Sequence, residues 1–188
     1  MEQHSESIIY VSQNCKAKEN RNTMRYSQIR KMDIVNGPGI RISLFTQGCP
    51  FHCKDCFNKE TWDFDGGFEW TSEKEKLLLD LCNRPQIKGL SILGGEPLIN
   101  QNLETLKILF TKFRELYPDK TIWMWTGNIY ENLTPEQKEV ADMVDVLIDG
   151  PWILKLGDFK LKYKGSSNQR VIDIKKTKES GKVELLDI

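Results

Sequence analysis

The chain has 188 residues, the length of one domain or of a domain with a tail. Its 27 Lys and Arg residues equal its 27 Asp and Glu residues, so there is no net charge to hold a polyanion, and a general nucleic-acid or anionic-membrane binder is disfavoured. The hydrophobic share of 39% and the charged share of 29% are typical of a folded globular protein and argue against disorder. No apolar run approaches the roughly 20 residues of a membrane span.

Residues 1–23 are predicted to be a polar leader that is weakly ordered or dispensable, because their only apolar run is 8–11 and a second plausible start lies at Met24. The leader lacks the basic stretch and the long apolar core of a signal peptide, so we expect a cytoplasmic protein. Five cysteines in such a chain argue against a disulfide framework. Cys15, in the leader, is expected to have no role.

Predicted strands and helices alternate from about residue 24 to residue 174. Apolar alternation or short apolar runs predict strands over 41–46, 88–93, 121–125 and 144–148. Capping residues and a 3.6-residue apolar period predict helices over 72–82, 102–117 and 135–143. The rest, to Ile174, is predicted to be irregular chain with one or two strands. The charged segment 175–188 is predicted to be a loose tail.

This alternation predicts an α/β fold with parallel strands joined by right-handed crossovers. A full eight-fold barrel needs about 250 residues. The sequence therefore predicts a single-domain open, or partial, β/α barrel.

Three of the five cysteines lie in one loop, Cys49, Cys53 and Cys56, with C-x3-C-x2-C spacing. Thiolates are soft ligands that both zinc and iron–sulfur clusters favour. Three ligands suit an iron–sulfur cubane that leaves one iron open to an exogenous ligand, and the spacing favours this interpretation. A zinc site would need a fourth ligand, either His52, which is poorly placed beside Cys53, or Cys82, which we expect to be a buried core thiol.

Further polar or glycine-rich motifs follow the predicted strands. They are Gly94-Gly95-Glu96-Pro97, Trp125-Thr126-Gly127 and Asp149-Gly150-Pro151-Trp152. Each in isolation is compatible with an ordinary turn. However, the carboxyl ends of parallel strands lie on one face, where β/α active sites are built. We therefore expect these motifs and Cys49 to converge on one rim that binds a cofactor, with the glycines allowing close backbone approach.

Other features are less informative. Residues 165–170 are polar and turn-forming, which is typical of a surface loop. Lys54 and Lys59 are expected to be solvated. The only histidines are His4 and His52, so hydrolysis with a histidine base is disfavoured.

The segment from Gly37 through Cys49, Cys53 and Cys56 to Asn58 resembles the signature of radical S-adenosylmethionine (SAM) activating enzymes, which install a glycyl radical on a partner enzyme. Within that family the chain is similar to the activating proteins of anaerobic ribonucleoside-triphosphate reductase. The similar segments occur in the same order over about residues 24–174, and the resemblance implies that this range is the radical SAM domain. It also rests on the segments 58–62, 94–97, 122–127, 149–150 and 165–170.

The resemblance implies that Cys49, Cys53 and Cys56 hold one [4Fe-4S] cluster whose open iron is chelated by the amino and carboxylate groups of SAM. The residues implied in SAM binding are Asp55, Cys56, Phe57, Gly94, Gly95 and Glu96. Many members of the wider superfamily have an aromatic residue before the third cysteine. Here Asp55 occupies that position and the aromatic residue follows as Phe57.

The implied reaction is reductive cleavage of SAM to methionine and a 5′-deoxyadenosyl radical, which removes a hydrogen from a glycine Cα of the anaerobic reductase. It requires no side-chain acid or base, and flavodoxin is the expected low-potential electron donor. Two alternatives remain open. One is a small-molecule radical SAM enzyme, for example a deazapurine-modifying one, and the other is a non-catalytic zinc or iron–sulfur binding module.

Overall fold

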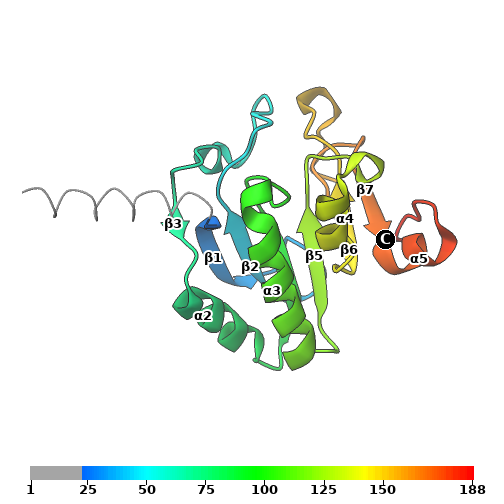
Figure 1. Ribbon diagram of the computed structural model, residues 1–188. Helices are drawn as coiled ribbons and strands as arrows, with labels where there is room; N and C mark the ends of the chain where they lie inside the picture. The colour runs from blue at the N-terminus through cyan, green and yellow to red at the C-terminus, as the bar shows by residue number, and fades with distance from the viewer. Residues whose placement is uncertain (1–22) are drawn as a thin grey trace, which may run out of the picture.

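The computed structural model describes residues 23–188, which form one seven-stranded sheet in the order β3-β1-β2-β4-β5-β6-β7 (Figure 1). The strands are β1 Arg25–Asp33, β2 Ile40–Thr46, β3 Phe68–Glu69, β4 Ile87–Gly94, β5 Thr121–Trp125, β6 Val146–Asp149 and β7 Arg170–Asp173. The helices are α2 Ser72–Cys82, α3 Asn100–Leu116, α4 Pro135–Ala141 and α5 Ile174–Ser180. The strands β2, β4, β5 and β6 are parallel. The predicted α/β class with parallel strands is therefore confirmed.

The edge strands were not predicted to be antiparallel. β1 pairs with both β2 and β3 in antiparallel fashion, and β7 pairs antiparallel with β6. Only the central crossovers have the helices that a parallel connection needs, because α2, α3 and α4 each link two of the four parallel strands. The parallel part of the sheet is therefore framed on both sides by antiparallel pairs.

Helices α2, α3 and α4 lie on one face of the sheet (Figure 1). The main core is formed between them, with alternate strand residues such as Leu44, Ile92 and Leu147 facing Leu106 and Phe110 of α3. The intervening strand residues face the other side, where a second cluster is formed by Trp123, Val146, Ile148 and Val171. This alternation is the period-2 pattern that a strand buried on both faces requires.

The predicted helix bounds are close to those observed. Thr71 caps α2 by accepting a hydrogen bond from the Lys74 backbone N–H, as the sequence predicts. Thr134 caps α4 in the same way and forms a capping box with Gln137. However, α3 begins two residues earlier than predicted and α4 ends two residues earlier. Strand β6 begins at Val146 instead of residue 144.

The prediction of a loose tail from Lys175 is wrong. Helix α5 starts at Ile174, is capped by the Asp173 side chain and ends at Gly181, which has a left-handed backbone. Leu185 then forms a β-bridge to Ile172. The sequence concealed this helix because only two of its seven residues are buried.

The predicted leader lies outside the described residues except for Thr23, so its predicted disorder and Cys15 remain predictions. None of the helices within residues 23–188 combines the length and the apolar character that crossing a bilayer requires.

The amino-terminal edge of the parallel strands is closed by Arg41, whose side chain is fully buried. Its Nε donates to the Ser91 hydroxyl at 2.7 Å, and its terminal nitrogens donate to the Thr121 hydroxyl and to the carbonyls of Leu90 and Thr121 at 2.8–2.9 Å. Burial lowers the pKa of Arg41 to about 10, so the guanidinium remains charged at neutral pH. Neutral hydrogen-bond acceptors thus compensate a buried charge.

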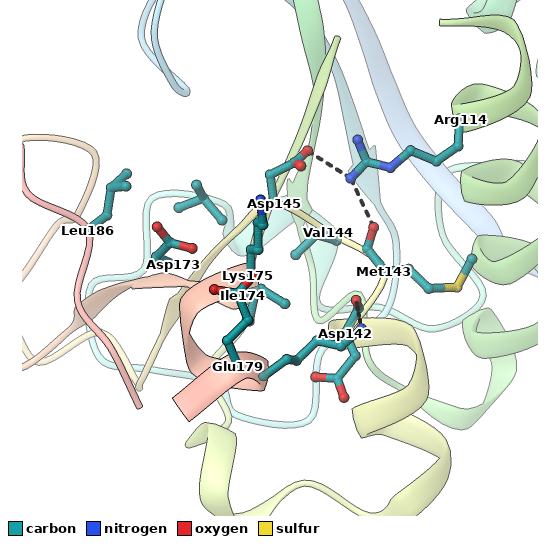
Figure 2. A pocket seen from close by; sticks show the side chains of 12 residues that line it. Arg114, Asp142, Met143, Val144, Asp145, Asp173, Ile174, Lys175, Glu179 and Leu186 are labelled. Atoms are coloured by element: carbon teal, nitrogen blue, oxygen red, sulfur yellow. Dashed lines mark hydrogen bonds and ion pairs between the residues drawn. The ribbon is translucent and has the colours of Figure 1, made fainter. Parts of the chain in front are cut away.

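A crevice of about 520 Å³ lies near the same edge, between α3, α5 and the end of α4. Figure 2 shows the side chains that line it. Arg114 crosses it to donate to Asp145 at 2.7 Å and to the Met143 carbonyl at 3.0 Å. Asp145 also accepts from the Ile122 backbone N–H at the start of β5. This crevice is larger than the cysteine-lined cavity described below. However, the two charged side chains that meet in it, Arg114 and Asp145, form an ion pair with each other. We therefore assign it to stability and not to chemistry.

Candidate functional site

The opposite, carboxyl-terminal edge carries the loops after β2 and β6, which both project beyond the sheet in Figure 1. A cavity of about 190 Å³ lies there. It brings together most of the predicted site residues, namely Cys49, Cys53, Cys56, Phe57, Gly94, Gly95 and Glu96. Thr126 and Gly150 also line it. The predicted convergence of the post-strand motifs on one rim is confirmed for these positions.

The two ends of the cysteine loop are hydrogen-bonded to each other. Where it leaves β2, the backbone N–H groups of Gly48 and Cys49 donate to the carbonyls of Thr61 and Trp62. Within the loop, His52 and Asp55 adopt left-handed backbone conformations with φ of 46° and 55°. Such conformations are costly for residues other than glycine and are concentrated at functional sites.

The three loop thiols are all partly exposed, and they differ in this from Cys82, which is buried in α2 as predicted. Burial raises the pKa of Cys49 and of Cys53, and for Cys53 the neighbouring Cys56 adds to that rise. Burial raises the pKa of Cys82 to about 12. The loop thiols are thus accessible to a ligand, whereas Cys82 is not.

The donor set of the cavity fits an iron–sulfur cluster better than a single zinc ion. Neither candidate for a fourth zinc ligand takes part, since His52 stacks on Trp62 at 4.6 Å between ring centroids and Cys82 belongs to the core. Between residues 23 and 188, no three His, Cys, Asp or Glu side chains gather closely enough to hold one metal ion. In a cluster, by contrast, each thiolate binds a different iron atom.

Two glycines bring the turn after β4 against the cysteine loop. Gly94 has φ of +106°, and a Cβ on Gly95 would lie 2.4 Å from the Gly48 carbonyl oxygen. This close approach is held by hydrogen bonds from the Gly95 N–H to the Thr46 carbonyl and from the Glu96 N–H to the Gly48 carbonyl, at 2.9 and 2.8 Å. The glycines are therefore required by packing of backbone against backbone.

The Glu96 carboxylate is buried, and its oxygens accept three hydrogen bonds from the chain itself. The donors are the Thr126 hydroxyl at 2.7 Å, the Gly127 N–H at 2.8 Å and the Leu98 N–H at 2.9 Å. Burial is the main cause that raises the pKa of Glu96, and these hydrogen bonds oppose it. In this structure Glu96 thus joins the turn after β4 to the turn after β5.

Asp149 follows the same strand-end pattern but does not line the cavity. Its side chain is fully buried and pairs with Arg170, which also pairs with Glu131. The Arg170 hydrogen bond lowers the pKa of Glu131 to about 2. Asp149 therefore connects β6 to β7 beneath the site.

The expectation that residues 165–170 form a surface loop is wrong. Ser166 and Gln169 are buried, and the Gln169 side chain accepts from the Gly165 and Ser166 N–H groups while donating to the Gly150 carbonyl. Gln169 also lines the cavity. The sequence signals of this role were the adjacent amides Asn168 and Gln169 in a glycine- and serine-containing turn, and the inclusion of residues 165–170 in the family resemblance.

Several cavity residues were not predicted from the sequence. They are Asn36, Phe51, Asn58, Gly165 and Gln169, whereas Trp125 and Trp152 belong to the predicted strand-end motifs. Trp152 packs on Phe57 with ring centroids 4.9 Å apart and donates from its indole N–H to the Lys54 carbonyl at 3.0 Å. It therefore connects the loop after β6 to the cysteine loop.

Of the residues implied in SAM binding, Asp55 is the one that does not line the cavity. It lines an adjacent groove and lies 3.7 Å from Lys59, in a pair of exposed side chains. Lys54 and Lys59 are exposed, as expected.

Comparisons with known proteins agree with this geometry. The family model for 4Fe-4S single cluster domains matches residues 35–172. Three similar proteins, each named anaerobic ribonucleoside-triphosphate reductase-activating protein, are those of Salmonella typhimurium, Escherichia coli K12 and Enterobacteria phage T4. The first two are 42% and 41% identical over 150 residues, which cover 79% of this chain and 97% of each relative. The phage protein is 39% identical over 148 residues, which cover 79% and 93%.

These matches extend over most of the chain and include the cysteine loop, the turn after β4 and the loop after β6. The chain therefore belongs to the family of anaerobic ribonucleoside-triphosphate reductase-activating proteins and carries a 4Fe-4S single cluster domain.

Proposed function

We propose that this chain is a radical SAM oxidoreductase that generates the glycyl radical on an anaerobic ribonucleoside-triphosphate reductase. One observation carries the proposal. Cys49, Cys53 and Cys56, all partly exposed, line the same cavity as the Gly94-Gly95-Glu96 turn. The names of the relatives support the reductase as the partner.

In this proposal the three cysteines hold one [4Fe-4S] cluster and leave its fourth iron to SAM. When bound, the cluster supplies one electron for the cleavage of SAM to methionine and a 5′-deoxyadenosyl radical, which takes a hydrogen from the reductase glycine. The radical SAM domain spans residues 24–174 as a partial β/α barrel. Its four parallel strands, with the cavity at their carboxyl ends, support that assignment. Residues 1–23 and 175–188 lie outside this domain.

The chain's own residues act by binding and positioning. Gly94 and Gly95 present backbone to the methionine end of SAM, and Glu96 holds the Thr126–Gly127 turn beside it. Cys56 and Phe57 contact SAM from the cysteine loop, and Asp55, whose side chain lies in the adjacent groove, contacts it through its backbone. No side-chain acid or base is needed, which agrees with His52 being stacked on Trp62.

The electron donor is proposed to be flavodoxin. The exposed Lys54 and Lys59, which flank the cysteines, support an acidic donor because opposite charges favour its encounter with the cluster loop.

Electron paramagnetic resonance of the anaerobically reconstituted and reduced protein, with and without SAM, tests the proposal. We expect a [4Fe-4S] signal that changes when SAM is added. Cys53→Ala should lose this response, while Cys82→Ala, a matched control in the core, should retain it. Bound zinc without an iron signal would contradict the proposal and favour the binding-module alternative.

A second assay separates the proposed function from a small-molecule enzyme. We expect release of 5′-deoxyadenosine in stoichiometric amounts with glycyl radical when the reductase is present. Full turnover with a small molecule and without the reductase would contradict the proposal.

A further inference from the structure

An apolar groove of about 410 Å³ adjoins the cysteine-lined cavity. Its apolar lining is formed by Val35, Phe57, Trp152, Leu154, Phe159, Leu161 and Tyr163. Phe159 is 96% exposed, Phe57 is 64% exposed and Leu154 is 45% exposed. Such a cluster of exposed large apolar side chains around a cavity is typical of a binding surface.

The groove and the cavity share one wall. Phe57, Trp152 and Gly165 line both. A chain lying in the groove is therefore separated from the cysteine-lined cavity only by this shared wall. The groove is placed for a substrate that reaches the cavity from the protein surface.

The segment 151–165, which we call the flap, is fixed at its base and exposed at its tip. At the base, the Trp125 indole N–H donates to the Tyr163 carbonyl at 2.7 Å, and Trp123 packs edge-on against the Tyr163 ring at 4.9 Å. At the tip, residues 153–160 are all exposed. An anchored flap can present its apolar side chains without first being ordered, which lowers the entropic cost of binding.

The flap is also positively charged. It contains Lys155, Lys160, Lys162 and Lys164 but a single acidic residue, Asp158. The whole chain, by contrast, has equal numbers of basic and acidic residues. The groove itself is lined by Asp55, Asp158 and Lys164, whereas the other three lysines lie outside its lining. The positive excess therefore surrounds the groove and favours a partner that is acidic at the margins of an apolar contact.

We propose that the flap groove is the docking site for an extended, acidic and apolar segment of the reductase, the one that delivers its glycine to the cavity. The inference rests on the proposed function and specifies where the partner binds. An extended segment fits this site because a chain lying along the groove meets the edge of the cavity at the shared wall of Phe57 and Trp152, where a glycine without a side chain can be presented.

The test measures two quantities on the full chain with reconstituted cluster. The first is the Kd for the anaerobic reductase of the same organism, by biolayer interferometry. The second is cleavage of SAM by dithionite without the reductase. The variants are Leu154→Asp/Phe159→Asp for apolar contact and Lys160→Glu/Lys162→Glu for charge. The controls are Leu116→Asp, at the exposed end of α3, and Lys175→Glu, on α5.

We expect both flap variants to raise the Kd at least tenfold and to lower the glycyl radical yield in proportion, with uncoupled cleavage unchanged. The controls should bind as the unmodified chain does. An unchanged Kd in the flap variants would overturn the docking site. So would loss of uncoupled cleavage together with binding, because the flap would then belong to the SAM site.

Failure of the proposed function looks different, since the unmodified chain would then cleave no SAM. Sedimentation velocity of the chain without the reductase tests a second copy of the chain as the occupant of the groove. If the flap variants dissociate a dimer and leave reductase binding intact, the groove is a self-association surface and the proposal is wrong.

Discussion

The two edges of the same four parallel strands have opposite characters. At the amino-terminal edge, polar groups bond to one another, as Arg41 does with Ser91 and Thr121. At the carboxyl-terminal edge, three thiols are partly exposed, and none of them is bonded to another cysteine within residues 23–188. The comparison teaches that one sheet separates stability from chemistry by strand polarity, as is general for β/α folds.

Backbone strain follows the same division. Within residues 23–188, the residues other than glycine with positive φ are His52, Asp55 and Tyr163. All three belong to the cysteine loop or the flap, on the carboxyl-terminal side. The edge that carries the chemistry is therefore also the one that departs from relaxed geometry.

The largest effect is expected from a substitution at the carboxyl-terminal edge, which we call the reactive edge. Cys53→Ala should reduce activation of the reductase to background, because the cluster loses one of its three ligands. Cys53 belongs to neither hydrophobic core cluster, so the melting temperature of the variant should stay close to that of the unmodified chain. Glycyl radical yield and thermal unfolding are the two measurements. A fully active variant would refute the cluster assignment.

The reverse experiment removes the buried hydrogen bonds of Arg41 at the amino-terminal edge. Arg41→Met should lower the free energy of unfolding by ~3 kcal/mol, because the hydroxyls and carbonyls that accept from the guanidinium lose their partner. Arg41→Lys should recover little of this, since an ammonium cannot reproduce the planar set of donors. Urea unfolding measures the loss. Iron content per folded molecule should be unaffected, and a specific loss of iron would contradict the separation of the two edges.

A third substitution tests the contact between two loops of the reactive edge. Gly95→Ala should cost ~2 kcal/mol of stability, because its Cβ would overlap the Gly48 carbonyl oxygen. The control is Gly181→Ala, where φ is +74° but no atom lies within 4 Å, so only the ~1 kcal/mol cost of the backbone conformation applies. Denaturant unfolding compares them. Equal losses would indicate that the loops separate easily.

The smallest expected effect concerns the ion pair beneath the site. Glu131→Gln should cost less than ~1 kcal/mol at pH 7, because the carboxylate is half exposed and screened by water. Since Arg170 lowers the pKa of Glu131 to about 2, the pair stabilises the fold above the ordinary glutamate pKa. That contribution is lost as the pH falls toward 2. The difference between variant and unmodified chain should thus shrink between pH 5 and pH 3 in urea titrations, and a constant difference would contradict the pairing.

Much of this separation could be predicted from the sequence, because strand and helix periods are local. The bounds of β2, α2 and β5 agree with their patterns to within one residue. The convergence of Cys49, Gly94 and Thr126 followed from strand polarity alone. What failed was non-local. The burial of Gln169 depends on its hydrogen bond to the Gly150 carbonyl, at the end of the neighbouring strand β6. Helix α5 has little apolar surface, so its formation depends on its packing against the rest of the fold.

The flap was hidden for the same reason. The sequence places Trp152 only in the motif that follows a predicted strand. Nothing in the neighbouring residues indicates that its indole N–H donates to the carbonyl of Lys54, 98 positions earlier in the chain. Such contacts are set by the folded loops together and leave no periodic trace.

The hydrogen bonds from Gly95 to Thr46 and from Glu96 to Gly48 carry a further consequence. They continue the pairing of β2 with β4 past the ends of both strands, so the start of the cysteine loop and the glycine turn form one rigid frame. Two attachment points for a cofactor are then spaced by backbone and not by side-chain rotamers. The entropy of arranging them is lost during folding, before any ligand arrives, and the site is preorganised.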